Sequence, residues 1–544
     1  MQTKQGNLWR SLVALAMILA PGAGGAAWTQ KASAAPAQTA PALPAQKPPS
    51  SAPPPQETQI TPAQARELFA DVGQILQFAS TDTKFPIKHD VKSRLISRAD
   101  VEKYLLSKMN DDKDAKRMER EEIVLKKFGL IDSDFQLRPF LVKLLDEQIA
   151  AYYDSRTKTV NLLNWIAPDQ QKPVLAHELT HALQDQDVNL DKWESPGSDN
   201  ISRTFKQDQR HVATDEDDTA RQAVIEGQAM AVFVDYSLAP FGRSLRNSPQ
   251  LIDVLLEQMT GNNSARDPVL ARAPLLLQES LLFPYKYGLK FEADLIADEK
   301  DPSAPFAGVL ARPPASSYEI MNPEAYERHV KVPVLTMPDI HPIIDANYNP
   351  YDIGVMGELD VKILSELYGG PQAANEFTPA WDGGIYYAAQ RRDAPDKDST
   401  SSVALFYLSQ WTSPSVAADF AKMYAAELGQ QYTQVTRDTQ DESDPSEQIY
   451  QTSQGPVLIA TTGNDVFVSE SFPLNTARKL EFFMVSAQQQ GSAQIASDSG
   501  YDPLRWVPAA PYFGTGSGVP RSDLTGNLVR FMASCGLMKA ALIR

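Results

Sequence analysis

The sequence has a single cysteine, Cys535, among its 544 residues, and it has only six histidines. One cysteine excludes an internal disulfide and a cluster of thiolates around a metal ion. Long apolar runs are also scarce. The run Leu12–Ala20 is about half of the ~20 residues that a membrane-spanning helix needs, and no later segment is long and apolar enough. We therefore expect no stable membrane span once the N-terminal segment has been removed.

Positive charge is in short supply as well. The chain has 51 Lys and Arg against 68 Asp and Glu, which gives a formal net charge of −17. A surface this negative repels phosphate backbones, so we expect no nucleic-acid partner. Hydrophobic residues make up 42% of the chain, which is enough for packed cores, and 544 residues exceed the length of one ordinary domain.

The N-terminus has the order of features that is typical of a secretory signal. Lys4 and Arg10 carry positive charge, the apolar run follows, and the small residues at 32–34 (ASA) offer a cleavage site. We therefore predict a signal peptide over residues 1–34 and a mature protein that is secreted or periplasmic. The alternative is that the segment stays uncleaved as an N-terminal anchor.

The rest of the chain divides by composition into an α+β protein of two domains. Residues 35–58 are rich in Pro and Ala and cannot bury a core, so they predict an extended linker. We expect a first domain over 59–345, a smaller α+β domain over 346–513, and a short tail over 514–544.

Hydrophobic periodicity predicts helices and strands in both domains. The expected helices are Ala63–Phe78, Lys103–Lys127, Phe140–Ala151, a helix that opens at Lys172-Pro173, Thr219–Tyr236, Val361–Leu367 and Ser415–Leu428. The expected strands are Lys158–Trp165, Ile385–Ala389, Val403–Leu408, Val457–Ala460 and Val466–Ser469.

The run His177-Glu178-Leu179-Thr180-His181 carries the clearest chemical signal. Two histidines four residues apart lie on one face of a helix, so their imidazole nitrogens can converge on one zinc ion, which imidazole suits. Glu178 can reach a water molecule that the metal acidifies, take its proton during attack on a carbonyl, and pass the proton to the leaving amine. We therefore predict His177 and His181 as Zn²⁺ ligands and Glu178 as the catalytic base.

The competing interpretation is a pair of ordinary histidines on a helix surface beside a solvated glutamate. A chance HExxH is rare in a chain with so few histidines, and the motif lies in a predicted helix that follows a predicted strand. Val174, Leu175 and Leu183 give that helix a buried side. We therefore prefer the metal site.

A third protein ligand is expected, because two histidines hold zinc weakly. Asp187 would be the ligand in a metzincin pattern, but that pattern needs a glycine at the position of Gln184. Glu226 is the better candidate, because its helix is apolar almost all round and a lone carboxylate there is costly unless it is paired or bound to a cation. Gly227 beside it lets another helix backbone approach closely. The alternative is a carboxylate that is paired with Arg221 or faces water.

Two neighbouring roles stay open in the sequence. The acids at 215–218 can favour a helix N-terminus, bind calcium or, through Asp218, support a zinc-bound histidine, as Asp185 can. The candidates for a group that stabilises the developing oxyanion are Tyr152, Tyr153, His211 and Tyr318.

Three stretches together resemble a group of exported bacterial metallopeptidase-like proteins. They are Tyr152-Tyr153-Asp154, LAHELTHALQDQ at Leu175–Gln186, and Ile225–Ala229. These proteins are similar to gluzincins, the zincins in which an HExxH pair is completed by a distant glutamate. The resemblance implies a zincin-like metallopeptidase domain over 59–345. It also implies that His177, His181 and Glu226 bind the metal and that Glu178 is the base.

The resemblance extends weakly to Pro313–Ser317 and Asn322–Tyr326. Related chains often have His-Pro where this one has Asn322-Pro323, so a role for that histidine does not carry over. The C-terminal domain is matched only loosely, and the resemblance implies a fold and a reaction type without naming a substrate.

We therefore expect an exported zinc metallopeptidase that acts on a peptide or protein substrate. Two other functions remain open: a binding or assembly protein that keeps a zincin scaffold without turnover, and a zinc hydrolase that cleaves an amide of a cell-wall peptide. The intact Glu178 argues against the first of these, because a scaffold needs no catalytic base.

Overall fold

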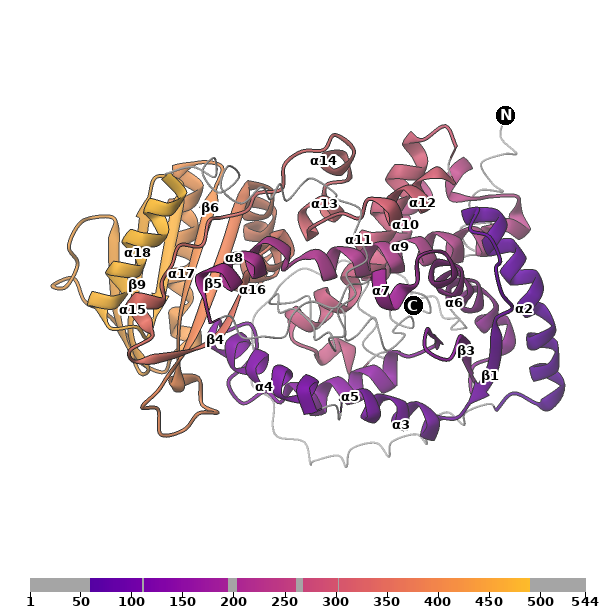
Figure 1. The fold of residues 1–544 in the computed structure, drawn as a ribbon, viewed down its shortest axis with the longest axis horizontal. Coiled ribbons are helices and arrows are strands. Elements are labelled where there is room, and N and C mark those ends of the chain that lie inside the picture. The colour runs from indigo at the N-terminus through magenta and orange to yellow at the C-terminus, as the bar shows by residue number, and fades with distance from the viewer. Residues whose placement is uncertain (1–58, 110–111, 194–202, 261–267, 302, 490–544) are drawn as a thin grey trace, which may run out of the picture.

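The computed structural model describes residues 59–109, 112–193, 203–260, 268–301 and 303–489. Helices and strands are mixed, in agreement with the expected α+β class, and the strands form two sheets. Figure 1 shows the larger sheet at one end of the molecule and the small sheet at the other. None of the described helices is long and apolar enough to cross a membrane. The predicted signal peptide, linker and tail lie outside the described residues, and the domain limits stay predictions.

The small sheet has the order β1-β3-β2 and consists of β1 (Lys92–Ile96), β3 (Thr159–Leu163) and β2 (Ala151–Asp154). β3 runs parallel to β1 and antiparallel to β2, so β2 is an edge strand. Every residue of β3 is buried. Gln171 fastens the next helix to this strand, because its side chain accepts from the N–H of Leu163 and donates to the carbonyl oxygens of Leu163 and Ile166.

Most of the helices precede the large sheet in the chain. They are α2 (Pro62–Thr83), α3 (Arg98–Met109), α4 (Asp112–Lys127), α5 (Leu137–Gln148), α6 (Pro168–Val188), α7 (Leu190–Trp193), α8 (Phe205–Thr214), α9 (Asp217–Leu238), α10 (Leu251–Thr260), α11 (Leu275–Asp298), α12 (Ala304–Ala311), α13 (Ser317–Met321), α14 (Pro323–Glu327) and α15 (His341–Ile344). The start of α2 follows from local chemistry, because Thr61 and Gln64 form a capping box and Pro62 fits the first turn.

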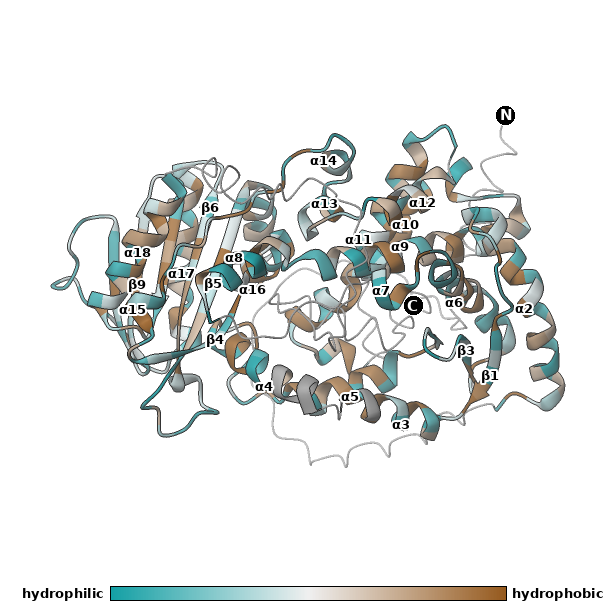
Figure 2. Cartoon of the chain, viewed as in Figure 1, coloured by the Kyte–Doolittle hydropathy of each residue, from teal (hydrophilic) through white to brown (hydrophobic). Residues whose placement is uncertain are grey.

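Helices α9 and α11 pack closely through two glycines. A Cβ built on Gly227 would lie 2.3 Å from the carbonyl carbon of Gly288, and one built on Gly288 would lie 2.1 Å from the carbonyl oxygen of Ala223. The expectation that Gly227 admits a neighbouring helix is therefore confirmed. Because α9 also packs against α6, it is buried on nearly every face, whereas α8 before it is largely hydrophilic (Figure 2).

The large sheet is antiparallel and has the order β4-β5-β6-β10-β9-β8-β7. Its strands are β4 (Tyr348–Val355), β5 (Trp381–Arg391), β6 (Val403–Trp411), β7 (Val435–Arg437), β8 (Glu447–Thr452), β9 (Gly455–Thr462) and β10 (Asp465–Glu470). Three helices accompany them: α16 (Glu358–Phe377), α17 (Pro414–Gln431) and α18 (Leu474–Gln489).

Both faces of the large sheet are covered, because successive residues of a strand point to opposite faces. In β6, Tyr407 packs in the same apolar cluster as Phe420 of α17. Its neighbour Phe406 packs in a second cluster with Leu480 of α18. All but one of the residues of β6 are therefore buried.

The end of α4 contacts the large sheet with a buried charge. Lys127 is 2% exposed and donates hydrogen bonds to Gln454 Oε1 (2.8 Å) and Ser471 Oγ (2.7 Å). Burial lowers its pKa to about 8. The ring of Phe128 packs edge-on against Tyr386 of β5, so the apolar core continues from the helices into the sheet.

Two buried acids tie the start of α9 to the same sheet and to α13. Asp215 Oδ2 accepts a hydrogen bond from the N–H of Val355 at the end of β4 (2.6 Å), and Glu216 Oε1 accepts from the hydroxyl of Ser317. Burial raises the pKa of Glu216 to about 8. A Cβ on Gly357 would lie 1.9 Å from the same Glu216 oxygen, so only glycine leaves room for this carboxyl group.

Most predicted elements are present with shifted limits. The helix predicted over 103–127 is two helices, α3 and α4, and the one predicted from Phe140 ends at Gln148. The expectation that the HExxH helix opens at Lys172-Pro173 is wrong. Pro168 occupies its first turn instead, and Pro173 lies inside the helix. Among the elements that were not predicted are α11, α18, β1, β2, β4, β7 and β8.

We predict that Gly227→Ala lowers the free energy of unfolding by about 1–3 kcal/mol, because the added methyl group collides with the backbone of α11. Urea denaturation measures the change. Gly73→Ala is the matched control. Gly73 lies within α2 with no heavy atom within 4 Å of an added Cβ, so alanine there should stabilise by about 0.5–1 kcal/mol. Equal effects of the two substitutions would contradict the close α9–α11 packing.

Glu216 predicts a pH dependence of stability. A carboxyl group whose pKa is higher in the folded protein binds its proton more tightly when folded. Its contribution is complete below pH 4.5 and is lost as the pH rises to about 8. We therefore expect the unfolding free energy of the wild type to fall relative to Glu216→Gln by about 1–3 kcal/mol between about pH 5 and pH 8. Chemical denaturation across this range measures it, and a constant difference would show that Glu216 is ionised when folded.

Candidate metal centre

Helix α6 carries the HExxH motif in its buried middle. Every residue from Val174 to Asp185 is buried. The exposed fraction is 0% for His177, 1% for Glu178 and 9% for His181. The interpretation of two ordinary surface histidines beside a solvated glutamate is therefore wrong.

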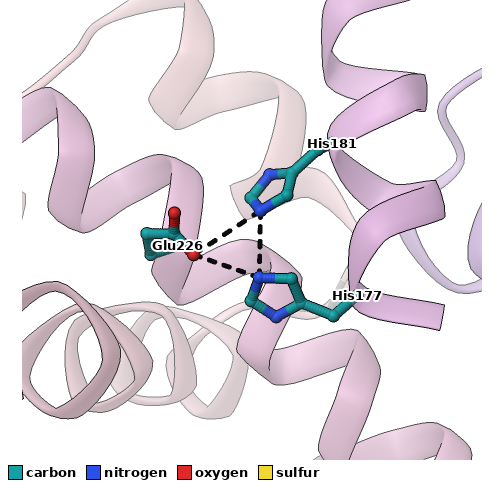
Figure 3. Close-up of side chains that lie close together, drawn as sticks. All are labelled: His177, His181 and Glu226. Atoms are coloured by element: carbon teal, nitrogen blue, oxygen red, sulfur yellow. Dashed lines mark hydrogen bonds and ion pairs between the residues drawn. The ribbon is translucent and has the colours of Figure 1, made fainter. Parts of the chain in front are cut away.

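The two histidines converge with Glu226 of α9 (Figure 3). His177 Nε2 lies 2.9 Å from His181 Nε2 and 3.0 Å from Glu226 Oε2, and His181 Nε2 lies 3.5 Å from the same oxygen. Three atoms bound tetrahedrally to zinc at ~2.0–2.1 Å would be about 3.3 Å apart. The triangle is therefore close to the size that a bound metal ion would give it. Among the described residues, no other three His, Cys, Asp or Glu side chains meet in this way.

The charges around this triangle favour a cation. Burial, with His181 nearby, lowers the pKa of His177 to about 4. Burial also opposes charge on His181, but the Glu226 carboxylate outweighs it and raises the pKa of His181 to about 9. Burial opposes ionisation of Glu226 too, yet the two histidines lower its pKa to about 2. A carboxylate and a neutral imidazole thus face a proton on His181, which a metal ion can replace.

Glu178 lies beside the triangle and against β2. Burial raises the pKa of its carboxyl group to about 7, and the backbone N–H of Tyr153 donates a hydrogen bond that opposes the shift. Its Oε1 atom has no hydrogen-bond partner among the described residues. This oxygen is therefore free to accept a proton from a reacting molecule.

Asp187, the other ligand candidate, and Arg221, the alternative partner of Glu226, both make other contacts. The carboxylate of Asp187 pairs with Lys88 (3.2 Å), and α6 runs on without the turn that the metzincin pattern needs. Arg221 donates to the carbonyl oxygen of Trp193 (2.7 Å) and lies over its ring. Of the residues that the sequence offered as a third ligand, the structure brings Glu226 to the histidines.

Asp185 does not support a ligand histidine. Its Oδ2 atom accepts from the hydroxyl of Tyr153 (2.7 Å) and from Lys158 Nζ (2.5 Å). His181 is supported instead by Gln184, whose Oε1 lies 2.9 Å from His181 Nδ1. The sequence analysis missed Gln184, because a glutamine three residues along a helix carries no signal of its own.

The four candidates for oxyanion stabilisation make other contacts. Tyr152 stacks on Tyr104, the hydroxyl of Tyr153 donates to Asp185, His211 pairs with Asp215, and Tyr318 packs against Trp381. The ring of Tyr285 in α11 stacks against His177 instead, with 6.4 Å between centroids. Nothing in the sequence related Tyr285 to HExxH, because α11 itself was not predicted.

A scan of the chain against protein-family models finds no match, and searches of curated proteins and of solved structures find none either. The resemblance to gluzincins therefore rests on the sequence motifs alone. The geometry and charge of the three converging side chains support a metal centre without it.

We predict that the purified protein binds about one equivalent of zinc and that His177→Ala or His181→Ala abolishes binding, because two remaining ligands hold zinc weakly. Glu226→Ala should lower both the zinc affinity and the stability that zinc adds, roughly 2.7 kcal/mol at a concentration 100 times the dissociation constant. Metal analysis and melting with and without a chelator measure these effects. Asp187→Ala is the control and should keep zinc. Loss of zinc in Asp187→Ala with retention in Glu226→Ala would overturn the ligand assignment.

Proposed function

We propose that the chain is an exported zinc-dependent metallopeptidase with a zincin-like first domain. The observation that carries the proposal is the triangle of His177, His181 and Glu226 beside Glu178. Two imidazoles and one carboxylate fit a catalytic zinc site, which uses three protein ligands and keeps one position for water or substrate. The proposal of export rests on the pattern at residues 1–34.

Zinc held by these ligands would supply Lewis acidity, which acidifies a water molecule and polarises a substrate carbonyl. Glu178 takes a proton from the water as the water oxygen bonds to the carbonyl carbon. When the carbon–nitrogen bond breaks, Glu178 passes that proton to the leaving amine. A pKa of about 7 suits a group that must accept and then release a proton near neutral pH.

The edge of β2 favours an extended peptide as the substrate. β2 pairs with β3 on one side, and among the described strands none pairs with its other side. The N–H of Tyr153 in this strand is directed at Glu178. An extended peptide can add to such an edge through backbone hydrogen bonds, which would bring one of its amides near the base.

The same three donors also suit Fe(II), which oxygenases bind through two histidines and one carboxylate. Glu178 favours hydrolysis, because a buried carboxyl group beside the ligands provides the proton transfer that amide cleavage needs. Elemental analysis of the purified protein distinguishes the two metals.

We predict that Glu178→Gln keeps zinc and loses hydrolysis of denatured casein by ~10²–10⁴-fold, because glutamine has nearly the same shape but cannot accept the proton. Chelator-treated wild type measures the metal-independent background. Glu358→Gln is the matched control, since it makes the same change at another buried glutamate, and it should keep turnover. Wild-type turnover in Glu178→Gln would show that another group is the base. Bound zinc without any hydrolysis by the wild type would favour the scaffold or the cell-wall amide hydrolase.

A further inference from the structure

A chain of buried hydrogen bonds leads away from His181. Gln184 Oε1 lies 2.9 Å from His181 Nδ1, and Gln184 Nε2 donates to the carbonyl oxygen of Ile225 (3.1 Å) and to Gln228 Oε1 (3.0 Å). Gln228 Nε2 donates in turn to the carbonyl oxygen of Phe306 (2.9 Å). Both glutamines are 0% exposed, so water does not compete for these bonds.

Two backbone carbonyls fix the direction of the whole chain. A carbonyl oxygen only accepts, so Gln228 must turn its NH₂ group to Phe306 and its oxygen to Gln184. For the same reason Gln184 must turn its NH₂ group to Ile225. The oxygen of Gln184 is then left facing His181, and it too can only accept. His181 Nδ1 must therefore carry a hydrogen.

We infer that Gln184, oriented by Gln228, is a positioning residue that holds neutral His181 as the tautomer with hydrogen on Nδ1. The lone pair of this tautomer lies on Nε2, the atom that faces His177 and Glu226. The inference rests on the proposed metal site and adds the groups that aim one of its ligands. A histidine ligand whose second nitrogen donates to a fixed acceptor is oriented and made more basic.

His177 lacks a support of this kind. Its Nδ1 atom is buried and has no hydrogen-bond partner among the described residues. Its ring is held by packing, including the stacked ring of Tyr285. The two histidines are therefore positioned by different means, and the effect of removing an acceptor should be confined to His181.

Gln184 also touches the helix of the third ligand. The carbonyl oxygen of Ile225, which accepts a hydrogen bond from Gln184 Nε2, belongs to the residue directly before Glu226 in α9. One side chain of α6 thus orients a histidine ligand and binds the backbone next to the carboxylate ligand. Two substitutions at this position separate the tasks. Leucine removes both, whereas glutamate keeps an acceptor for His181 and removes the donors.

The test measures the zinc affinity of the full-length mature protein by competition with a chelator, and the melting temperature of the same protein without metal. Gln184→Leu should lower the affinity by about 10–100-fold. Gln184→Glu should keep most of the affinity while the metal-free protein melts at a lower temperature. Thr180→Val is the matched control. It removes another buried side-chain hydrogen bond of α6, from Thr180 Oγ1 to the carbonyl oxygen of Ala176, and should leave the affinity unchanged.

A second readout reports the tautomer itself. In zinc-loaded protein, proton NMR should show a slowly exchanging Nδ1–H of His181 that is absent from Gln184→Leu. Wild-type affinity in Gln184→Leu, or affinity losses that follow the melting temperature across all three variants, would overturn the inference. Neither readout uses hydrolysis, so a protein that binds zinc as described but cleaves no peptide would sink the proposed function and leave the positioning of His181 standing.

Discussion

The buried carboxylate of Glu226 is the constraint on which the arrangement of the long helices depends. A charge on an apolar helix is costly unless an opposite charge or a metal compensates it. Helix α9 meets this requirement by packing against α6, which brings two imidazoles within 3.5 Å of the carboxylate. It can bury its remaining faces as well, because Gly227 lets α11 approach at backbone distance. The charge of Glu226 thus determines how α6 packs against α9, and the small size of Gly227 determines how closely α11 packs.

The position of Glu226 also depends on the large sheet. Asp215 and Glu216 fasten the start of α9 to β4 and α13, and Glu226 follows after about two and a half turns. Contacts at the first turn of α9 therefore help to set the position of Glu226. The sheet therefore helps to position the candidate metal centre, although it contributes none of the three converging side chains.

The parts of the centre that could be predicted from the sequence are those where a motif or an out-of-place residue is visible locally. HExxH was visible as a motif, and Glu226 was visible because a carboxylate interrupts an apolar helix. The other residues of the centre and its supports carry no local signal of this kind. The acids at 215–218 looked like a helix N-terminus, but Asp215 and Glu216 bind a strand and a short helix that lie more than 100 residues away in the chain. Tyr285 and Gln184 act through tertiary contacts, and a local pattern cannot show these.

The fold was predictable to a similar degree. Strands such as β6 and β9 were found because they are continuous apolar runs, whereas β1 and β8 have mixed composition and depend on their partners. The start of α6 was misplaced because two prolines, Pro168 and Pro173, both suit a first turn. Gln171 decides between them, since its bonds to the end of β3 need a helix that has already begun.

The polar groups of the centre fall into two layers with opposite hydrogen-bond requirements. In the supporting layer, the side-chain oxygen and the NH₂ group of Gln184 and of Gln228 all have hydrogen-bond partners. A buried network whose groups are satisfied in this way is rigid. In the inner layer, Glu178 keeps an oxygen without a partner among the described residues. A buried acceptor without a partner lowers the stability of the fold, and a bound molecule that donates a hydrogen bond to it offsets this loss. Within the candidate centre, this oxygen thus belongs to the carboxyl group that the proposed chemistry requires to accept a proton.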